Sequence, residues 1–337
     1  MSANGIPTEV LVAPDSFKGT FTATQVAAAI CRGLAAGGQP AQPCPVADGG
    51  EGTLDALSEA LGLELVTETV SDPLGRPVQA TFGLGRGGVA VVETAAGSGL
   101  GLVAESERDA VAATTYGTGE LIAAALRAGA REVYVAVGGS ATTDGGEGAL
   151  SALRDAGVGA AKLTVLCDVR TPFEDAARVF GPQKGADPAT VELLGERLQQ
   201  QALAYPRDPR GVAMTGAAGG LAGGLWAQYG AELVPGAAFV LNTIGYDTRM
   251  RAARAVVTGE GRLDRQSLVG KLVSEVATRA RQAGVPCHVV VGRNELDPFD
   301  ARILDLQLIL EATDLAEMEL SGSRIAERIR SENDRGR

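Results

Sequence analysis

Short runs of β-branched residues alternate along this 337-residue chain with stretches rich in alanine and leucine. Such alternation predicts βα units around a largely parallel sheet, because each helix packs on the sheet between two neighbouring strands. The first unit is expected to have a strand at 9–13, a polar loop at 14–19 and a helix opened by the capping pair Thr22 and Gln25. The loop then lies at the carboxyl end of a strand, where open α/β sheets bind ligands.

The length of the chain favours two domains rather than one. Between residues 65 and 93 three strand-like runs follow one another without the helices seen elsewhere, which indicates a meander. We expect this meander to mark the entry into a second, inserted domain, with the chain returning to the first domain near residues 235–255.

An acidic glycine turn occurs twice, at 48–52 and again 96 residues later at 144–148, each time as Asp-Gly-Gly-Glu-Gly before a leucine- and alanine-rich helix. The glycines allow backbone amides to approach a ligand at a helix start, and the acids can hold Mg²⁺. Two tight turns with helix-capping acids are the plainer alternative. We expect one copy in each domain.

Lysine is rare, with four lysines among thirty basic residues, and three of them stand beside a glycine in a polar loop: Lys18, Lys184 and Lys271. An ammonium is a compact charge that fits between phosphate oxygens, so this pattern indicates phosphate chemistry, although coding bias in a glycine-rich chain would also produce it. The loop at 138–143 offers amides and hydroxyls for an anion. Glycines at 216–220 open a helix, and 258–264 follows an expected strand at 255–257.

The formal charge of -11 argues against a nucleic-acid or anionic-membrane partner. The four cysteines form no CxxC pair and residues 1–5 do not resemble a signal sequence, so we expect a reduced, cytoplasmic protein. The uncharged stretch 212–231 contains too many glycines for a membrane span. The single histidine, His288, lies in an apolar strand and is expected to be packed, which excludes a serine-histidine triad and a multi-histidine metal site.

Two common nucleotide-binding signatures are absent from the sequence. A GxGxxG match at 83–88 runs into a strand instead of a helix, which disfavours a nicotinamide-dependent oxidoreductase. No Gly-Lys pair has the upstream glycine of a Walker A loop, and the protein-kinase signatures are missing.

Nine ordered motifs nevertheless resemble the bacterial type I glycerate kinases (glycerate 2-kinases) over nearly the whole chain: APDSFKGT, PVADGGEGTLDAL, SDPLGRPV, YGTGELI, GGSATTDGGEGAL, CDV, FGPQKGA, GAAGGLAGGL and TGEGRLDRQSLVGK. The resemblance implies an ATP- and Mg²⁺-dependent enzyme that converts D-glycerate to 2-phosphoglycerate. It also implies an α/β fold with a Rossmann-like domain at 1–68 and 236–337, an inserted α/β domain at 69–235, and an active site in the cleft between them. Two departures from the family pattern are a short segment at 155–166 and Thr143 in place of an expected asparagine.

Phosphoryl transfer needs mainly alignment and neutralisation of charge. We expect the base that orients the glycerate hydroxyl to be Asp15 or Asp264, and Mg²⁺ to be held by Asp48 or Glu51 together with Glu260 or Asp264. Lysines at 18, 271 and 184 would contact phosphates or the glycerate carboxylate, and Arg262 could clamp a carboxylate. The catalytic candidates are Asp15, Lys18, Asp264 and Lys271. The substrate- or phosphate-binding candidates are Ser16, Gly49, Gly50, Gly139, Ser140, Lys184, Gly219, Gly220 and Arg262, and the metal candidates are Asp48, Glu51 and Glu260.

Several alternatives stay open at this point. A kinase of another small hydroxy acid would use the same loops, and a glycerate kinase could form 3-phosphoglycerate instead. A nucleotide-binding module without catalysis and an oxidoreductase are weaker rivals. The chain could also form a homodimer.

Overall fold

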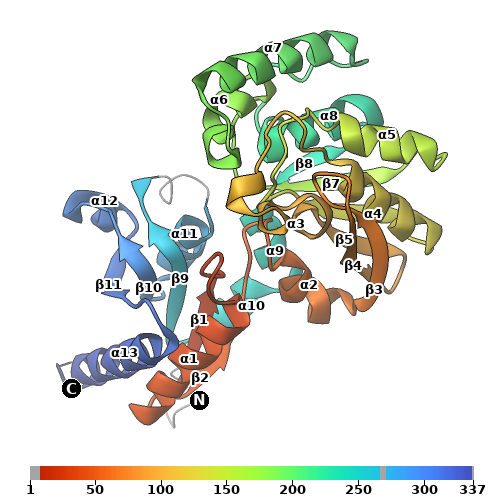
Figure 1. Cartoon of the computed structure of the whole chain (residues 1–337). Coiled ribbons are helices and arrows are strands. Elements are labelled where there is room, and N and C mark those ends of the chain that lie inside the picture. Colours follow the sequence, from red (N-terminus) through yellow and green to blue (C-terminus); the bar gives the residue numbers. More distant parts are fainter. Residues whose placement is uncertain (1–7, 266–270, 336–337) are drawn as a thin grey trace. The chain divides into compact units, whose positions relative to one another are not determined.

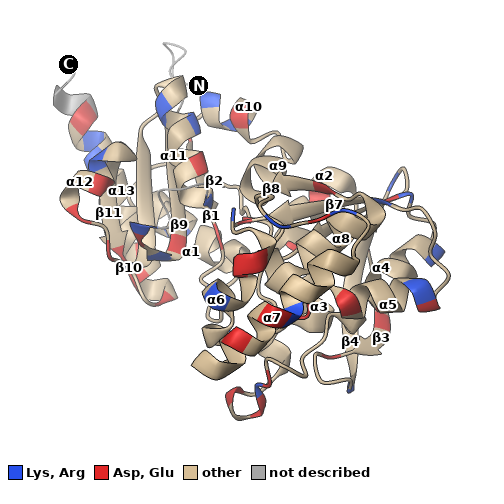
Figure 2. Ribbon diagram, turned by 90° about the horizontal axis from the view of Figure 1, so that it is seen from above, with Lys and Arg blue, Asp and Glu red and all other residues tan. Residues whose placement is uncertain are grey.

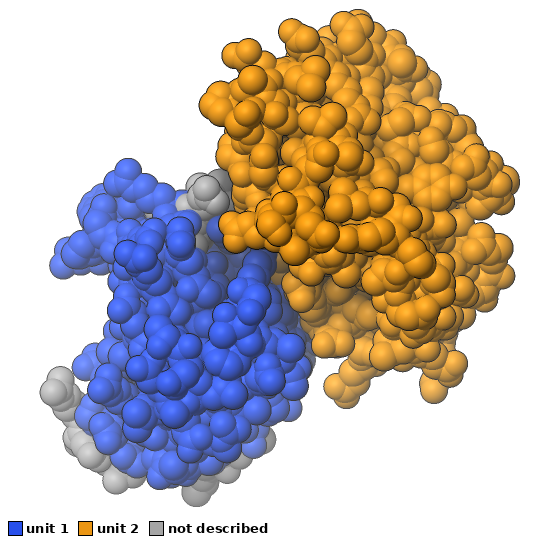
Figure 3. All heavy atoms as spheres, in the orientation of Figure 1, with its two compact units in different colours: residues 1–47, 240–337 blue, residues 48–239 orange. Residues whose placement is uncertain are grey.

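The computed structural model describes residues 8–265 and 271–335. Its contacts divide the chain into two compact units, which Figure 3 shows in two colours. Unit 1 comprises Met1–Ala47 and Val240–Arg337, and unit 2 comprises Asp48–Phe239. Unit 2 is therefore an insertion in the sequence of unit 1. The predictions made for residues 1–5 and for the part of the TGEGRLDRQSLVGK motif at 266–270 lie outside the described residues.

Unit 1 contains, within the described residues, a five-stranded sheet in the order β11-β10-β9-β1-β2 (Figure 1). All of its neighbouring strands run parallel. This is the parallel Rossmann-like sheet that the sequence predicted. Its strands are β1 (Val10–Pro14), β2 (Ala41–Pro43), β9 (Ala255–Leu263), β10 (Cys287–Asn294) and β11 (Leu306–Glu311).

The helices α1 (Ala23–Ala36) and α13 (Leu315–Arg335) cover one face of this sheet. Their apolar residues form a buried cluster with Val10, Val12 and Val257 of the strands. The predicted capping box begins α1, since the Gln25 amide donates to Thr22 Oγ1 at 3.2 Å and the Thr22 amide donates to Gln25 Oε1 at 2.9 Å. The other α-helices of unit 1 among the described residues are α10 (Tyr246–Arg251), α11 (Leu272–Ala283) and α12 (Pro298–Ile303), while α9 (Gly236–Thr243) contains the point at which the chain passes from unit 2 to unit 1.

Unit 2 is built on a six-stranded sheet in the order β3-β4-β5-β6-β7-β8. The first three strands form the predicted antiparallel meander, and the strands from β5 to β8 run parallel. Gly83 and Gly85 lie in β4 and Gly88 lies in the turn to β5, so the GxGxxG match does not open a helix. The strands are β3 (Glu64–Ser71), β4 (Pro77–Gly85), β5 (Val89–Glu93), β6 (Glu132–Ala136), β7 (Lys162–Cys167) and β8 (Glu232–Pro235).

The sequence placed the first domain boundary near residue 68, whereas the change of unit occurs at residue 47. The physical reason is long-range pairing, because Glu64 to Ser71 form a continuous antiparallel ladder with β4. The helix α2 (Thr53–Leu61) packs on β4 and β5 and so also belongs to unit 2.

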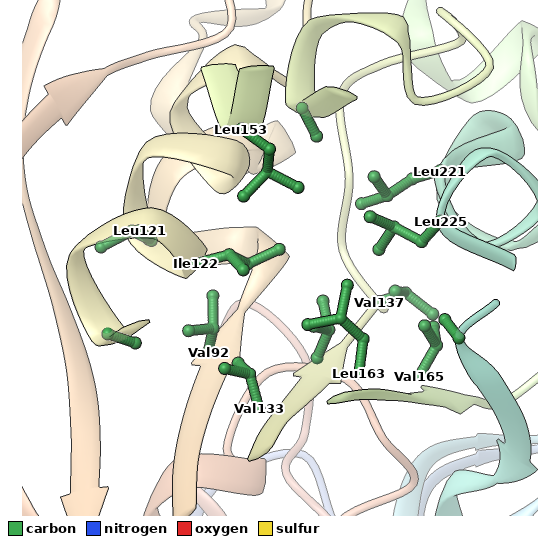
Figure 4. Packing of buried hydrophobic residues seen from close by; sticks show 14 of the residues in the cluster. Val92, Leu121, Ile122, Val133, Val137, Leu153, Leu163, Val165, Leu221 and Leu225 are labelled. Carbon is green, nitrogen blue, oxygen red and sulfur yellow. The ribbon is translucent and has the colours of Figure 1, made fainter. Parts of the chain in front are cut away.

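Helices on one face of the unit 2 sheet form a large apolar core. Figure 4 shows Val92, Val133 and Val165 of the strands beneath leucines and isoleucine of α4, α5 and α8. The helices and short 3-10 turns of unit 2 beyond α2 are α3 (Thr94–Ser98), η1 (Leu100–Leu102), η2 (Glu105–Glu107), α4 (Tyr116–Arg127), α5 (Glu147–Asp155), η3 (Phe173–Asp175), α6 (Ala176–Phe180), η4 (Pro182–Lys184), α7 (Pro188–Ala204), η5 (Ala217–Gly220) and α8 (Leu221–Tyr229).

The uncharged stretch at 212–231 is divided between η5 and α8 and is not one helix. No helix among the described residues is both long and apolar enough to cross a membrane. Figure 2 shows basic residues interspersed with acidic residues in both units. The short segment noted in the sequence joins α5 directly to β7 through residues 156–161.

Candidate active site

The two acidic glycine turns adopt the same local hydrogen bond. The Gly50 amide donates to Asp48 Oδ1 at 3.0 Å, and the Gly146 amide donates to Asp144 Oδ1 at 3.1 Å. Both turns use glycines with left-handed backbone angles, for example Gly52 with φ of 95° before α2. Both copies lie in unit 2, so the expectation of one copy in each domain is wrong.

The surroundings of the two aspartates differ. Asp144 Oδ2 also accepts hydrogen bonds from the Thr115 amide at 2.8 Å, the Thr115 hydroxyl at 2.8 Å and the Gly148 amide at 3.1 Å. Glu147 forms an ion pair with Arg154 at 2.7 Å. These contacts give the second copy a structural role. The choice of Asp48 and Glu51 as metal candidates in the first copy stays a prediction.

Glycines from distant parts of the sequence meet at the carboxyl ends of the parallel strands in unit 2. The Gly138 amide donates to the Gly49 carbonyl at 3.3 Å, and a Cβ on Gly138 would lie 2.5 Å from Gly50 Cα. A Cβ on Gly49 would lie 2.9 Å from the Leu166 carbonyl oxygen, at the end of β7, and 3.0 Å from Gly236 Cα, just after β8. The structure therefore joins the turn at 48–50 to the start of the loop at 138–143, at the sheet edge where α/β proteins bind ligands.

The loop at 138–143 is held from two sides. On one side the Leu100 amide donates to the Gly139 carbonyl at 2.8 Å, and the Ala141 amide donates to the Ser98 carbonyl at 2.9 Å. On the other side Lys184, which is 2% exposed, donates to Ser140 Oγ at 3.0 Å and to the Thr142 carbonyl. Burial lowers the pKa of Lys184 to about 7, against the opposing effect of Asp144. Lys184 thus supports this loop from a buried position. Gly139, which precedes Ser140 in the loop, is exposed.

Gly219 and Gly220 pack against the end of the same loop. Gly219 has φ of 64°, and a Cβ there would lie 2.0 Å from the Thr142 carbonyl oxygen. A Cβ on Gly220 would lie 2.7 Å from the ring of Phe173. The Gly145 amide donates to the Gly219 carbonyl at 3.0 Å. Close backbone approach therefore accounts for glycine at both positions.

Glu93, the last residue of β5, is a further candidate that the sequence did not single out. Its Oε1 accepts the Leu54 amide at 2.8 Å and so caps the first turn of α2. Burial raises the pKa of Glu93 to about 7, against the effect of the Leu54 and Gly52 amides, and the nearby acids Asp55 and Glu51 raise it further. The only local signal was its place at the carboxyl end of an apolar strand.

In unit 1 the loop after β1 lies beside the end of β9. The Asp15 amide donates to the Gly259 carbonyl at 2.8 Å, and the Ser16 amide donates to Asp15 Oδ1 at 2.7 Å. A Cβ on Gly261 would lie 3.7 Å from Phe17 Cα and 3.8 Å from the backbone nitrogen of Lys18. Ser16 Oγ is buried and has no hydrogen-bond partner within 8–265 and 271–335. A buried hydroxyl of this kind is suited to a ligand oxygen.

The strand β9 is longer than predicted, because it continues through Glu260 and Arg262 to Leu263 instead of ending near Val257. Glu260 and Arg262 are two residues apart in a strand and so share one face. Arg262 is exposed and its Nε lies 3.9 Å from Glu295 Oε1. Lys271 is the residue before α11. Unit 1 therefore brings Asp15, Ser16 and Lys18 close to the Glu260–Arg262 segment, with Asp264 just beyond the end of the strand.

The part of the chain that the structure describes holds no group of three or more His, Cys, Asp or Glu side chains arranged for a metal ion. Thr143, which replaces the expected asparagine, is buried, and its hydroxyl has no partner among the described residues. His288 is 1% exposed within β10, as predicted, and burial lowers its pKa to about 4.

A model of the glycerate kinase family matches residues 10–159 and 154–324. The chain belongs to this family. It is 38% identical over 326 residues to a glycerate kinase of Bacillus subtilis (strain 168), with 84% of this chain and 85% of the relative covered. It is 36% identical over 323 residues to a glycerate 2-kinase of Escherichia coli (strain K12), with the same coverage of 84% and 85%.

A solved structure supports the same conclusion. The crystal structure assigned as glycerate kinase 2 from Salmonella typhimurium LT2 superposes with a TM-score of 0.79 at 31% identity, covering 97% of this chain and 100% of that one. Membership of the glycerate kinase family makes this protein a kinase and confirms the predicted α/β fold with its inserted second domain.

Proposed function

We propose that this kinase transfers the γ-phosphoryl group of ATP to D-glycerate and forms 2-phosphoglycerate and ADP. The observation that carries the proposal lies in unit 1, where a buried serine hydroxyl, a lysine and an aspartate share the loop that follows β1. That loop runs beside the strand segment that carries Glu260 and Arg262. Such a group can bind anionic oxygens and orient a hydroxyl in one place, which is what phosphoryl transfer requires.

The roles of the residues follow from their chemistry. Asp15 is 4% exposed, and Asp264 lies just after β9; a carboxylate at either position could accept the proton of the glycerate hydroxyl. Lys18 is exposed and Lys271 is partly exposed, so that their ammonium groups can approach phosphate oxygens. Arg262, with an exposed guanidinium, is suited to the carboxylate of the acid.

The donor set fits the nucleotide and metal that the proposal needs. The glycines at 49, 50 and 139 lie at the carboxyl edge of the unit 2 sheet, where backbone can come close to phosphate oxygens. Mg²⁺ prefers carboxylate oxygens and keeps contacts to phosphates and water, so one or two acids suffice. Asp48 and Glu51 are the candidates in unit 2 for holding the ion and Glu260 is the candidate in unit 1, and a bound ion would supply neutralisation of charge on the phosphoryl oxygens.

The test compares the variants K18A and D264N in a coupled assay of ADP formation with ATP and D-glycerate. We expect each to lose about 10²-fold or more in turnover, because each acts on the transferring group. K162A is the matched control, since Lys162 is exposed and pairs with Glu132 in unit 2, and it should keep the turnover of the wild type. If K18A and D264N both turn over normally, the assignment of the site is wrong.

Phosphorus NMR of the product distinguishes 2-phosphoglycerate from 3-phosphoglycerate directly. A panel of small hydroxy acids separates glycerate from related substrates, since the same cations would bind any short carboxylate. The cytoplasmic location belongs to the same proposal, because ATP and a phosphorylated three-carbon acid are intracellular metabolites.

A further inference from the structure

Lys184 was expected to touch a phosphate or carboxylate, yet its ammonium is buried under the loop at 138–143. It donates to two oxygens of that loop, the hydroxyl of Ser140 at 3.0 Å and the carbonyl of Thr142. Lys184 is the last residue of η4, and its Nζ lies 5.9 Å from the centre of the Phe180 ring. A direct contact with substrate does not explain this buried position, so Lys184 needs another role.

An ammonium group has three donors and no acceptor. Ser140 Oγ must then accept the hydrogen bond from Lys184, which leaves the Ser140 O–H as a donor toward another group. Within the described residues no hydrogen bond uses that proton. Ser140 is 6% exposed and stands next to the exposed Gly139.

The helix α7, which follows Lys184 in the sequence, and the residue after it hold the turn at 144–148 in the same way. Gln201 of α7 donates to the Asp144 carbonyl at 3.0 Å, and Tyr205 donates to the Gly145 carbonyl at 2.9 Å. Carbonyl oxygens of this stretch thus accept hydrogen bonds from η4, α7 and the residue after α7. In a trans peptide the N–H points away from the C=O, so the Thr143 N–H is directed away from the oxygen that Lys184 binds.

We propose that Lys184 is a positioning residue, which fixes the Ser140 hydroxyl as a hydrogen-bond donor to an anionic oxygen of the substrates. The proposal rests on the proposed function, because it assigns Ser140 to the binding of a phosphate or carboxylate oxygen. The two sources of that oxygen, ATP and D-glycerate, share the same chemistry. Their separate KM values tell which one Ser140 binds.

The protonation of Lys184 gives a readout that packing alone would not produce. Burial lowers its pKa to about 7, so the ammonium is present below pH 7 and is replaced by a neutral amine above it. A neutral amine can accept the Ser140 proton, and the directed donor is then lost. The charged groups that face this region are Asp144, which favours the ammonium, and Arg108, which donates to the Gln183 carbonyl at 3.4 Å.

The experiment measures KM for ATP and for D-glycerate in the wild type, K184M, S140A and the double variant, between pH 6 and pH 8.5. At pH 6 we expect K184M and S140A each to raise one of the two KM values about tenfold, with a smaller effect on kcat. The double variant should show no further increase, because both changes remove the same donor. The wild-type KM should rise more steeply as the pH passes 7 than the KM of K184M or of S140A, which keep only the pH dependence of the substrates and of other groups.

The matched control is K162M, which makes the same chemical change at an exposed lysine and should leave both KM values and their pH dependence as in the wild type. Met is one atom shorter than lysine and carries no charge, and thermal unfolding of K184M checks that it folds. If it does not fold, the pH dependence of S140A against the wild type decides the matter. Wild-type KM values in K184M, additive effects in the double variant, or a pH dependence in S140A equal to that of the wild type would overturn the inference. A wild-type enzyme that does not phosphorylate D-glycerate would instead refute the proposed function.

Discussion

Replacing His288 with leucine should make the stability of unit 1 less dependent on pH in the acid range. His288 lies in β10 beside Val257 of β9, is 1% exposed, and neither ring nitrogen has a hydrogen-bond partner among the described residues. Burial lowers its pKa from 6.5 to about 4, Glu332 of α13 opposes this shift and Arg328 adds to it. The folded protein therefore keeps this imidazole neutral, while the unfolded chain takes up a proton below pH 6.5.

The sign and size of the effect follow from proton linkage. Because the unfolded state binds more protons between about pH 4 and pH 6.5, the stability contributed by a neutral His288 is present above pH 6.5 and is lost as the pH falls through this window. With a pKa of 6.5 in the unfolded chain and about 4 in the folded protein, the free energy of unfolding at pH 5 is about 2 kcal/mol lower than at pH 7.5 through His288 alone. H288L has no imidazole at this position and should not lose this stability at pH 5. It should also be as stable as the wild type or more stable at pH 7.5, since a buried polar group without a partner costs about 1–3 kcal/mol.

The assay is urea unfolding of both proteins at pH 5 and pH 7.5, followed by far-UV circular dichroism and by tryptophan fluorescence. The single tryptophan, Trp226, lies in α8, so its fluorescence reports on unit 2 and serves as an internal reference. Comparing the pH effect in the wild type with that in H288L removes the contribution of the carboxylates, which both proteins share. Equal pH effects in the two proteins would refute the reasoning.

Three further predictions concern local structure, and urea unfolding measures all of them. The T22A substitution removes the side-chain cap of α1 and should lower the free energy of unfolding by about 1 kcal/mol. T24A, at an exposed position in the same helix, should change the free energy of unfolding by less than about 0.5 kcal/mol. G219A should destabilise by more than about 3 kcal/mol because its Cβ would lie 2.0 Å from a backbone oxygen; G52A, with φ of 95° and nothing within 4 Å, should cost only about 1–2 kcal/mol. D144N should lose about 2–3 kcal/mol, since the buried carboxylate accepts backbone and hydroxyl hydrogen bonds on both oxygens, and an unchanged unfolding midpoint would contradict its structural role.

Local patterns were sufficient for much of the fold. The alternation of strand and helix signals predicted the parallel sheets, and the Thr22–Gln25 pair predicted the start of α1. The extent of β9 could not be predicted in the same way, because glycines at 259 and 261 disfavour a strand locally. Pairing with β1 ends at Gly259, and pairing with β10 on the other side extends the strand to Leu263. Likewise the pairing of β3 with β4 decides the domain boundary, and no composition change marks it.

The candidate site shows the same division between local and long-range information. Glycine-rich turns at strand ends were visible in the sequence, because their residue types are unusual at those places. Glu93 gave no such signal, since a single acid at the end of an apolar strand is common and its capping of α2 depends on folding. Lys184 looked like a ligand contact because lysine beside glycine suits a loop, but burial under Ser140 and Thr142 is a property of the tertiary structure.

The two Asp-Gly-Gly-Glu-Gly turns show why a motif alone does not assign a metal role. Their identical sequence produces the same hydrogen bond from the second glycine to the aspartate. In the second copy Thr115 lies against Asp144 and occupies its second oxygen with two hydrogen bonds. A carboxylate that is buried and already accepts several hydrogen bonds would have to give them up to bind Mg²⁺, at a cost of about 1.5–3 kcal/mol each. The backbone neighbours of the two turns differ as well, because the turn at 48–50 packs against Gly138 and the strand end at Leu166, whereas the turn at 144–146 packs against Gly219 and Gly220. The chemistry left to each copy is therefore decided by what packs against the turn and not by the motif.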